Sequence, residues 1–282
     1  MKLSTFLEYS VHSFEVDHLK KLKALGYDGI DFCFHPSLFR DGKEESIIAR
    51  IKENLDAAGL ACSQVHLPFY DLRLPSTCHD DFVERQMQGA CKAMTVLGAK
   101  WGAWHPVSAP ECSHDRRVAM KANKEMLARH LGYAEKYGVG IAVENIFAPF
   151  FSSVVEDHIE LIESMHSPLV GACWDFGHAN LQESERGHAE DFKMIADKIK
   201  ILHVNDNHAR EDRHLAPGFG TAKFDELLPI LFRSGFDGYF NMECSVPRRQ
   251  PEIMLYYYGL MAKSAHILID EAMSALGKET KK

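Results

Sequence analysis

Residues 201–206 read Ile-Leu-His-Val-Asn-Asp, an apolar, strand-like run that ends in residue types able to bind a metal. Three other segments end in the same way, namely Val-Glu-Asn (143–145), Trp-Asp-Phe-Gly-His (174–178) and Met-Glu-Cys (242–244). Imidazole and carboxylate groups are the ligands that borderline and hard divalent metals select. When parallel strands form a barrel, their C-terminal ends meet at one opening. We therefore expect the four segments to build one metal site.

Apolar or β-rich runs alternate along the chain with segments of helical periodicity. The predicted strands are residues 2–7, 29–34, 61–67, 100–105, 140–144, 170–175, 201–205 and 239–244. The predicted helices are residues 15–25, 44–58, 80–97, 115–137, 154–166, 188–198, 224–234 and 252–274. Strand–helix alternation repeated eight times is typical of an α/β fold of the (β/α)8 TIM barrel type. A doubly wound sheet is the less favoured alternative.

The domain organisation follows from the length and the even pattern. No linker or low-complexity tract interrupts the 282 residues, so we predict one barrel domain over residues 1–276 and a flexible charged tail over residues 277–282. The N-terminal apolar stretch is interrupted by Glu8 and is too short for a signal peptide, and no apolar run reaches membrane-spanning length. We expect a cytoplasmic protein with no membrane partner.

Cysteine usage and net charge limit the classes of function. The seven cysteines are an odd number without a Cys-x-x-Cys pair, which argues against a disulfide framework and predicts buried, reduced thiols. The net charge of −8 opposes non-specific attraction to nucleic acid. We therefore expect no nucleic-acid partner.

Polar residues that bind metals fall at the C-terminal end of six consecutive predicted strands. They are His66, His105, Glu144, Asp175, His178, His203, Asp206 and Glu243, and the loop after the seventh strand adds Asp212 and His214. A single histidine at a strand end is more often structural than a ligand. Carboxylates inside the apolar sequences Ile-Ala-Val-Glu and Phe-Asn-Met-Glu, however, would be costly to bury unless a cation offset their desolvation. The cluster as a whole therefore predicts metal binding.

Other residues have weaker assignments. Trp104 and Trp174 flank strand ends, where they could stack on a sugar ring or line the barrel. Tyr256, Tyr257 and Tyr258 could pack on a neighbouring subunit or on their own barrel, so a homo-oligomer stays open. Eight histidines in helical or loop stretches are assigned to the solvated surface: His18, His79, His114, His130, His158, His166, His188 and His266.

The motifs resemble the xylose isomerase-like TIM barrels, a family that includes ketose 3-epimerases, inosose isomerases and dehydratases, and endonuclease IV. The resemblance rests on His-Val-Asn-Asp followed by Asp-x-His-Leu-x-Pro-Gly, and it implies a metal site of Glu144, Asp175, His203 and Glu243. By the same resemblance, Glu144 and Glu243 are the catalytic acid and base that move a proton through an enediolate. This implies a sugar or sugar-phosphate isomerase or epimerase.

The resemblance also implies contacts to a small sugar substrate. His178 would orient a substrate oxygen, and Arg210 lies one residue away from the position of an arginine that the epimerases use, with Arg213 as the substitute. The predicted substrate-binding residues are His66, His105, His178, Arg210, Trp104 and Trp174.

Endonuclease IV implies a competing function. Its trinuclear zinc site has nine ligands, and each has a counterpart here: His66, His105, Glu144, Asp175, His178, His203, Asp212, His214 and Glu243. Such a cluster would hydrolyse phosphoesters. The acidic balance of the chain opposes a role in DNA repair, and a sugar or inosose dehydratase is a further alternative. Zinc is the favoured metal, manganese, cobalt and magnesium also suit the ligands, and no organic cofactor is expected.

Overall fold

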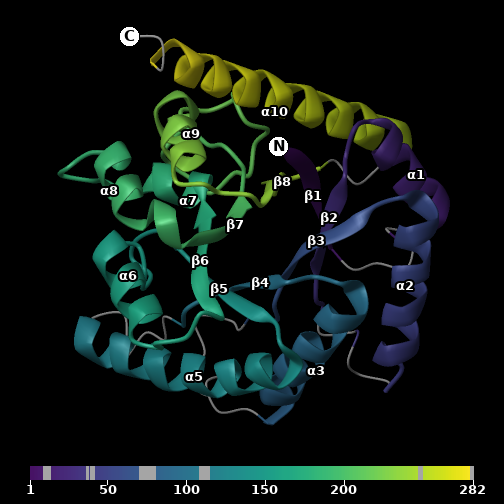
Figure 1. Cartoon of the computed structure of the whole chain (residues 1–282), viewed down its shortest axis with the longest axis horizontal. Coiled ribbons are helices and arrows are strands. Elements are labelled where there is room, and N and C mark those ends of the chain that lie inside the picture. The colour runs from purple at the N-terminus through teal and green to yellow at the C-terminus, as the bar shows by residue number, and fades with distance from the viewer. Residues whose placement is uncertain are drawn as a thin grey trace.

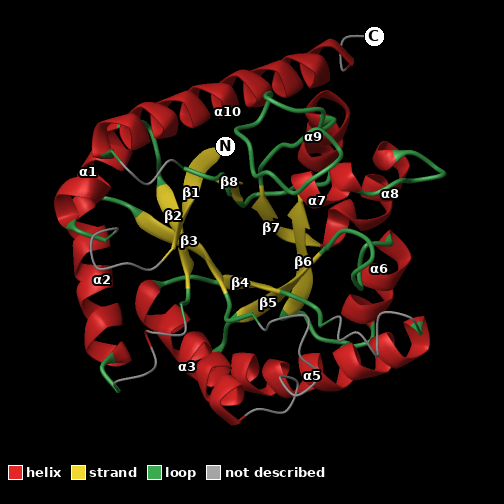
Figure 2. Cartoon of the chain, turned by 180° about the vertical axis from the view of Figure 1, so that it is seen from behind, coloured by secondary structure: helices red, strands yellow, loops and turns green. Residues whose placement is uncertain are grey.

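The fold is a barrel of parallel strands surrounded by helices (Figure 1, Figure 2). We describe it from a computed structural model, in which residues 1–8, 14–35, 38, 42–69, 81–107, 115–246 and 250–279 are described. Within these residues, eight strands form one sheet in the order β7-β6-β5-β4-β3-β2-β1-β8, and every pairing is parallel. The predicted TIM barrel is confirmed.

The strands lie close to the predicted ranges. They are β1 (Lys2–Glu8), β2 (Gly29–Cys33), β3 (Ala61–His66), β4 (Trp101–Trp104), β5 (Gly140–Glu144), β6 (Val170–Asp175), β7 (Ile199–His203) and β8 (Tyr239–Met242). The ring closes just beyond β7, where the Val204 N–H donates to the Asn241 carbonyl at 2.8 Å and the Glu243 N–H donates to the Val204 carbonyl at 3.0 Å. Closure brings the ends of β7 and β8 together, so their polar residues face the same opening.

Helices follow the strands and form an outer layer, with α10 next to α9 and α1 (Figure 1). They are α1 (Val16–Ala24), α2 (Glu44–Ala58), α3 (Asp81–Leu97), α5 (Arg116–Tyr137), α6 (Val155–Glu163), α7 (Phe176–Leu181), α8 (His188–Ile195), the 3-10 helix η3 (Ala196–Lys198), α9 (Phe224–Arg233) and α10 (Pro251–Glu279). The sequence pattern did not predict α7. This helix has only six residues, too few to show a helical period, and the Asp175 side chain caps its first turn.

The chain end differs from the prediction. Helix α10 continues through Glu279, so residues 277–279 of the predicted tail are helical, and residues 280–282 lie outside the described residues. Among the three tyrosines of this helix, Tyr256 is 82% exposed, whereas Tyr258 is buried and its carbonyl accepts a hydrogen bond from the Tyr27 hydroxyl. Within the described residues, no helix combines the length and apolarity needed to cross a membrane.

Two clusters of buried hydrophobic residues form the core of the barrel. The larger one fills the layer between strands and helices, and the smaller one lies among Ala103, Ala142, Cys173 and Ile201, with Trp101 packed against it. The four clustered residues come from β4 to β7. Trp101 leaves no room for a side chain at Gly140, where an added Cβ would lie 2.2 Å from the indole. The indole and these small side chains thus fill one part of the core, while the polar residues described below occupy the C-terminal end of the strands.

Two histidines assigned to the surface are fully buried, so those assignments were wrong. His130 of α5 accepts a hydrogen bond from Trp104 Nε1 at 2.8 Å, and His158 of α6 donates from Nε2 to the Val143 carbonyl at 2.7 Å. Both rings lie on the faces of their helices that pack on the barrel. Each ring has one hydrogen-bond partner on the strands, and such partners are not visible in the local sequence. His166 and His266 are exposed as predicted, and His79 and His114 lie outside the described residues.

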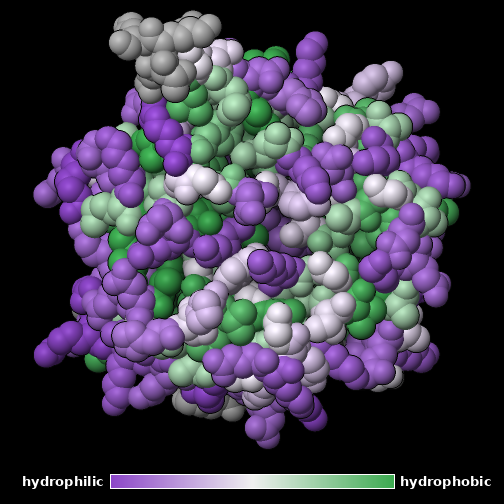
Figure 3. All heavy atoms as spheres, viewed as in Figure 1, coloured by the Kyte–Doolittle hydropathy of each residue, from purple (hydrophilic) through white to green (hydrophobic). Residues whose placement is uncertain are grey.

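The surface and the thiols agree with the composition. The outline of the face in Figure 3 is mostly hydrophilic, with smaller hydrophobic areas between the polar side chains. The thiols of Cys33, Cys62, Cys91 and Cys173 are buried and form no disulfide, and Cys244 is partly exposed. Cys78 and Cys112 lie outside the described residues.

Candidate metal centre

The four residues of the predicted metal site lie together at the C-terminal end of the barrel. Glu144, Asp175 and His203 are the last residues of β5, β6 and β7, and Glu243 directly follows β8. One potential ligand atom from each lies within 4.8 Å of the others, and all four residues are buried. The strand ends therefore supply a compact set of three carboxylates and one imidazole, which suits a divalent cation.

His203 is central to this group. Its Nδ1 lies 3.1 Å from Glu144 Oε1 and 3.0 Å from Glu243 Oε2, so one nitrogen faces both carboxylates. The ring is fully buried and stacks on the His66 ring at a centroid distance of 5.5 Å. This arrangement fixes the spacing between the two glutamates that the sequence singled out as an acid–base pair.

Asp175 has two functions in the local structure. Its Oδ1 accepts the His178 backbone N–H at 2.6 Å and so begins α7, while its Oδ2 accepts from Asn205 Nδ2 at 2.7 Å. Asn145 holds the backbone of Asp175 by a reciprocal pair, with its Oδ1 accepting from the Asp175 N–H and its Nδ2 donating to the Asp175 carbonyl. The carboxylate is thus held by α7 and Asn205, and its backbone is held by Asn145.

His66 and His105 form a second group with Glu144. His105 Nε2 lies 3.0 Å from Glu144 Oε2, and His66 Nε2 lies 3.9 Å from the same oxygen. The two rings are 4.8 Å apart between centroids. Glu144 therefore lies between this pair of imidazoles and the four-residue group, and its two oxygens could bind a metal in either group.

His178, Asp212 and His214 form a third group. The Asp212 Oδ2 atom lies 3.4 Å from His178 Nε2 and 3.2 Å from His214 Nε2. The three ligand atoms meet the same 4.8 Å spacing as the other groups. The nine residues that the resemblance assigned to a multinuclear site therefore lie in three adjoining groups.

Three of the histidines are oriented by backbone carbonyls. His66 Nδ1 donates to the Leu67 carbonyl at 3.0 Å, His178 Nδ1 to the Asn145 carbonyl at 2.8 Å, and His214 Nδ1 to the Glu243 carbonyl at 2.8 Å. A carbonyl oxygen only accepts, so these bonds place the proton on Nδ1 and turn Nε2 toward the carboxylates. Fixing the outer nitrogen of a ligand histidine in this way is a common feature of metal sites.

The histidines stabilise the ionised form of both glutamates, whereas Asp175 differs. Burial favours the neutral form of Glu144, but His203 and His105 outweigh burial and hold its pKa well below the usual range. Burial likewise acts against ionised Glu243, yet His203 and His214 lower the pKa of this carboxyl to about 2. Asp175 differs, because burial together with the charges of Glu243 and Glu144 raises its pKa to about 6 despite the opposing effect of His178. Both glutamates are therefore ionised at neutral pH.

Unpaired buried atoms show that the donor set fits a cation. Among the described residues, His105 Nε2, Glu144 Oε2 and His203 Nδ1 are buried without a well-aligned hydrogen bond, although each lies 3.0–3.1 Å from an atom of opposite type in the same groups. Buried polar atoms normally have partners, so such atoms need an explanation. A divalent ion at the centre of the groups would give these three atoms a partner.

A cavity of about 530 Å³ opens over the groups. One part of its lining is apolar and includes Phe6, Phe34, Pro68 and Phe69. The polar part consists of His66, His105, Glu144, His178, Asp212, His214 and Glu243. Three of the predicted substrate-binding residues, His66, His105 and His178, thus line a space of the size that small ligands occupy.

The other three predicted substrate contacts lie elsewhere. Trp104 is 1% exposed and packs between the barrel and α5, where its Nε1 bonds to His130, so it does not reach the cavity. Its place in the strand is the reason, since residues next to each other alternate between the two faces and the neighbouring Ala103 faces the barrel interior. Arg210 is exposed and lines a separate cavity of about 580 Å³ together with Arg213.

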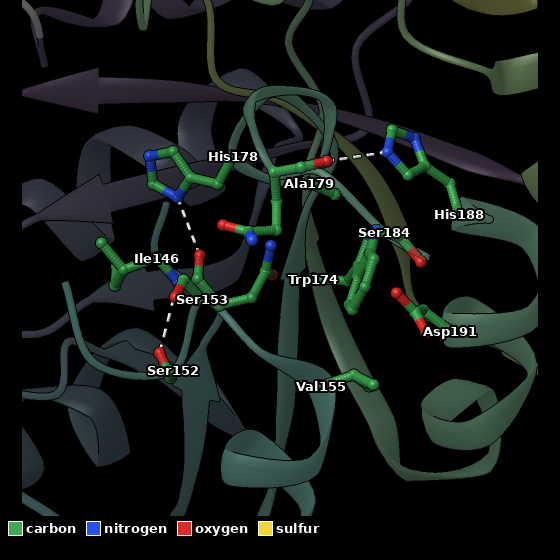
Figure 4. A pocket seen from close by; sticks show the side chains of 12 residues that line it. Ile146, Ser152, Ser153, Val155, Trp174, His178, Ala179, Ser184, His188 and Asp191 are labelled. Atoms are coloured by element: carbon green, nitrogen blue, oxygen red, sulfur yellow. Dashed lines mark hydrogen bonds between the residues drawn. The ribbon is translucent and has the colours of Figure 1, made fainter. Parts of the chain in front are cut away.

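Trp174 lines a small pocket behind α7. Figure 4 shows Trp174 and His178 among the side chains that line it, and the indole also packs edge-to-face on Phe192. The pocket that the metal groups face does not include Trp174. Trp174 packs on Phe192, and its contact with a substrate stays a prediction.

Several polar residues that support the groups were not predicted from the sequence. Asn145 and Asn205 belong to the quoted motifs, and their places beside Glu144 and His203 were the signal available. Asp206, named as a residue of the catalytic end, instead accepts from the backbone N–H groups of Gly218, Gly220 and Ala222, and so folds the following loop.

Known proteins of the epimerase and endonuclease classes match part of the chain. Two curated relatives are the fructoselysine 3-epimerase of Escherichia coli O157:H7, 28% identical over 126 residues (42% of this chain and 43% of the relative), and the probable endonuclease 4 of Bacillus subtilis, 36% identical over 88 residues (27% and 30%). The chain spans less than two thirds of the length of the curated relatives it matches.

Solved structures match over nearly the whole chain. A D-tagatose 3-epimerase-like protein has a TM-score of 0.77 at 23% identity, with 99% of this chain and 100% of that chain covered. The IOLI protein with a bound zinc atom has a TM-score of 0.71 at 20% identity, with 98% and 99% covered. The sequence profile described as "Xylose isomerase-like TIM barrel" matches residues 19–259. The chain therefore belongs to the xylose isomerase-like TIM barrel family.

Proposed function

We propose that this protein is a divalent-metal-dependent isomerase or epimerase of a sugar or sugar phosphate, and that it moves a proton by way of an enediolate. One observation carries the proposal: Glu144 and Glu243 lie within 3.1 Å of the same His203 nitrogen and both line the cavity. Two ionised carboxylates on one substrate space suit the removal of a proton from carbon and its return. The relatives named as 3-epimerases support this class of reaction.

The residues would divide the work as follows. Glu144, Asp175, His203 and Glu243 would hold the ion, with zinc favoured by the imidazole and manganese, cobalt or magnesium as alternatives. When bound, a divalent ion polarises a carbonyl group and acidifies the neighbouring C–H bond. One glutamate would take the proton and the other would deliver a proton to the carbon. His178, whose Nε2 lies 3.4 Å from Asp212, would donate to a substrate oxygen.

Solvent exchange tests this proposal directly. Metal-loaded protein would be incubated in deuterium oxide with a panel of free and phosphorylated ketoses, and the products would be examined by NMR spectroscopy. We expect deuterium at the carbon next to the carbonyl group of at least one sugar. Absence of exchange across the panel, with metal demonstrably bound, would count against the proposal. A cytoplasmic location and the absence of a nucleic-acid partner belong to the same proposal.

A second candidate function is phosphoester hydrolysis by several zinc ions. The observation that favours it is the presence of three ligand groups, which use His66, His105, His178, Asp212 and His214 in addition to the four-residue site. Metal analysis of protein purified without chelator distinguishes the two candidates. Near one ion per chain would support the isomerase, whereas two or three ions with hydrolysis of a phosphodiester such as bis(p-nitrophenyl) phosphate would favour the second candidate.

A further inference from the structure

A layer of buried polar side chains lies inside the barrel near His203. Asp31 of β2, Gln64 of β3 and Asn241 of β8 are at most 1% exposed. Gln64 Nε2 donates to Asp31 Oδ2 at 3.0 Å and to the Leu202 carbonyl at 3.1 Å, and Asn241 Nδ2 donates to the same Asp31 oxygen at 2.8 Å. The Gln64–Asp31 bond joins the paired strands β2 and β3. The bonds from Gln64 to Leu202 of β7 and from Asn241 to Asp31 join strands that are not neighbours, so these two contacts cross the interior of the barrel.

Burial of the Asp31 carboxylate inside the barrel is unfavourable, because the carboxylate loses its hydration. This carboxylate has no exposed surface, and a buried carboxylate needs hydrogen bonds or a countercharge to offset lost hydration. The two amides supply hydrogen bonds but carry no charge. The ion-pair contact found for Asp31 among the described residues is with His203, whose Nε2 lies 3.5 Å from Asp31 Oδ2. The carboxylate is therefore aimed at the outer nitrogen of a candidate metal ligand.

His203 differs from the other histidines of the centre in what its outer nitrogen meets. His66, His178 and His214 each direct Nδ1 to a backbone carbonyl and Nε2 to the centre. His203 is turned the other way, with Nδ1 toward Glu144 and Glu243 and Nε2 toward Asp31. A carboxylate accepts a stronger hydrogen bond than a neutral carbonyl and raises the basicity of the coordinating nitrogen.

We propose that Asp31 is a positioning residue that holds the proton of His203 on Nε2 and so presents the Nδ1 lone pair to the metal. The inference rests on the metal site of the proposed function. Gln64 and Asn241 fix the Asp31 carboxylate, and a small movement of the imidazole toward Oδ2 completes the hydrogen bond. The polar layer thereby orients the one imidazole that lies between both catalytic glutamates.

The test uses the full chain labelled with nitrogen-15 at histidine and loaded with zinc. Long-range proton–nitrogen spectra, assigned with a His203→Asn variant, should show zinc on Nδ1 and a proton on Nε2 of His203. Asp31→Asn removes the charge at nearly constant size. We expect it to weaken zinc binding by about 10- to 100-fold, the usual effect of losing such a partner, and to speed exchange of the Nε2 proton with water.

The control variant is Ser4→Ala. It removes the 2.9 Å hydrogen bond from Ser4 Oγ to Asn241 Oδ1, in the same polar layer but away from His203, and should leave zinc affinity unchanged. Wild-type spectra with the proton on Nδ1 would overturn the inference, as would a folded Asp31→Asn protein that binds zinc as tightly as the wild type. If Asp31→Asn does not fold, the proton position of His203 in the wild-type spectrum tests the inference by itself.

Failure of the inference is separable from failure of the proposed function. Zinc bound with the expected proton position, but without turnover of any ketose, would leave the role of Asp31 intact and remove the sugar chemistry. Turnover of a ketose by a protein whose His203 carries its proton on Nδ1 would support the sugar chemistry and remove the role of Asp31. A wild-type protein that binds none of zinc, manganese, cobalt and magnesium would overturn both.

Discussion

At the scale of single residues, the two glutamates differ from every surface carboxylate in what surrounds them. Glu144 and Glu243 are buried, ionised and directed at one imidazole nitrogen. His105 and His66 approach Glu144 from one side, while His214 lies near Glu243. The reactivity proposed for this pair comes from the shared environment, because the histidines keep both carboxylates ionised although burial favours their neutral form.

Replacing Glu243 by Gln should remove the catalytic carboxylate while preserving its volume. We expect the rate of deuterium incorporation to fall by about 10²- to 10⁴-fold, the usual contribution of a positioned acid or base. Exchange rates measured for the wild type and the variant at saturating metal would check this. Glu226→Gln, an exposed residue in the first turn of α9, is the matched control and should retain full activity. Near-normal exchange in Glu243→Gln would remove that residue from the mechanism.

His158 should make the stability depend on pH. Burial lowers its pKa from 6.5 to about 4, although the Val143 carbonyl acts in the opposite direction. Between pH 6.5 and 4 the unfolded chain therefore binds a proton that the folded chain does not. The neutral, buried His158 ring therefore leaves the free energy of unfolding at its full value above pH 6.5. As the pH falls from 6.5 toward 4, this group lowers the free energy of unfolding by about 3 kcal/mol in total.

Urea unfolding at several pH values checks this prediction. His158→Gln should show a smaller fall in the free energy of unfolding between pH 6.5 and 4 than the wild type. His266→Gln, an exposed residue of α10, serves as the control and should keep the wild-type dependence. Parallel curves for His158→Gln and the wild type would show that burial of this ring does not govern the acid sensitivity.

At the scale of elements, α7 connects the strand ends to the centre. Asp175 ends β6 and caps α7, and the helix then brings His178 beside Glu144 at 3.4 Å. Gly177 lies where the helix passes the end of β7, and a Cβ there would meet Asn205 Oδ1 at 1.8 Å. Since Asn205 holds the Asp175 carboxylate, the close approach at Gly177 is part of how the site is assembled.

Gly177→Ala should therefore disturb both the packing and the metal site. The methyl group forces Asn205 to move, so we expect a loss of about 1–3 kcal/mol of stability, typical of overpacking, together with weaker zinc binding. Gly132→Ala is the control, because Gly132 is exposed within α5 with open space around it, and its replacement should stabilise the helix slightly. Thermal unfolding and zinc titration measure the two effects. Equal behaviour of the two variants would contradict the role given to Gly177.

At the scale of the whole molecule, closure of the barrel creates the centre. Residues from β3 to β8 contribute to the three ligand groups, and no single segment contains a complete set. A metal ion should therefore contact residues from distant parts of the folded chain, and it should bind the unfolded chain much more weakly. Metal affinity and global stability are linked for this reason.

Chelation should lower the melting temperature. At a free zinc concentration 100-fold above its dissociation constant, the folded state gains about 3 kcal/mol. For a chain of this length such a gain corresponds to roughly 5–10 °C. Differential scanning calorimetry with chelator, and with increasing zinc, measures the shift. A melting temperature that does not depend on zinc would contradict the metal site, whereas magnesium at the same concentration should have a smaller effect because an imidazole ligand favours zinc.

The sequence by itself determined the class of fold, because alternating strand and helix patterns report local periodicity and local burial. It also placed candidate ligands at strand ends, since a strand end is a local feature. It missed α7, which is too short to show a period, and assigned His130 and His158 to the surface, because their partners lie on other elements.

Tertiary structure alone decided which candidates share a space. It placed Trp104 behind the barrel wall and Arg210 in a separate cavity, and it gathered nine ligand candidates into three groups. It also set the carboxylate of Asp31 opposite His203, two residues 172 positions apart in the chain (203 − 31) that no local pattern connects. Strand direction and periodicity are encoded locally, whereas the distance between side chains on different strands depends on barrel closure and register, which a single stretch of sequence does not contain.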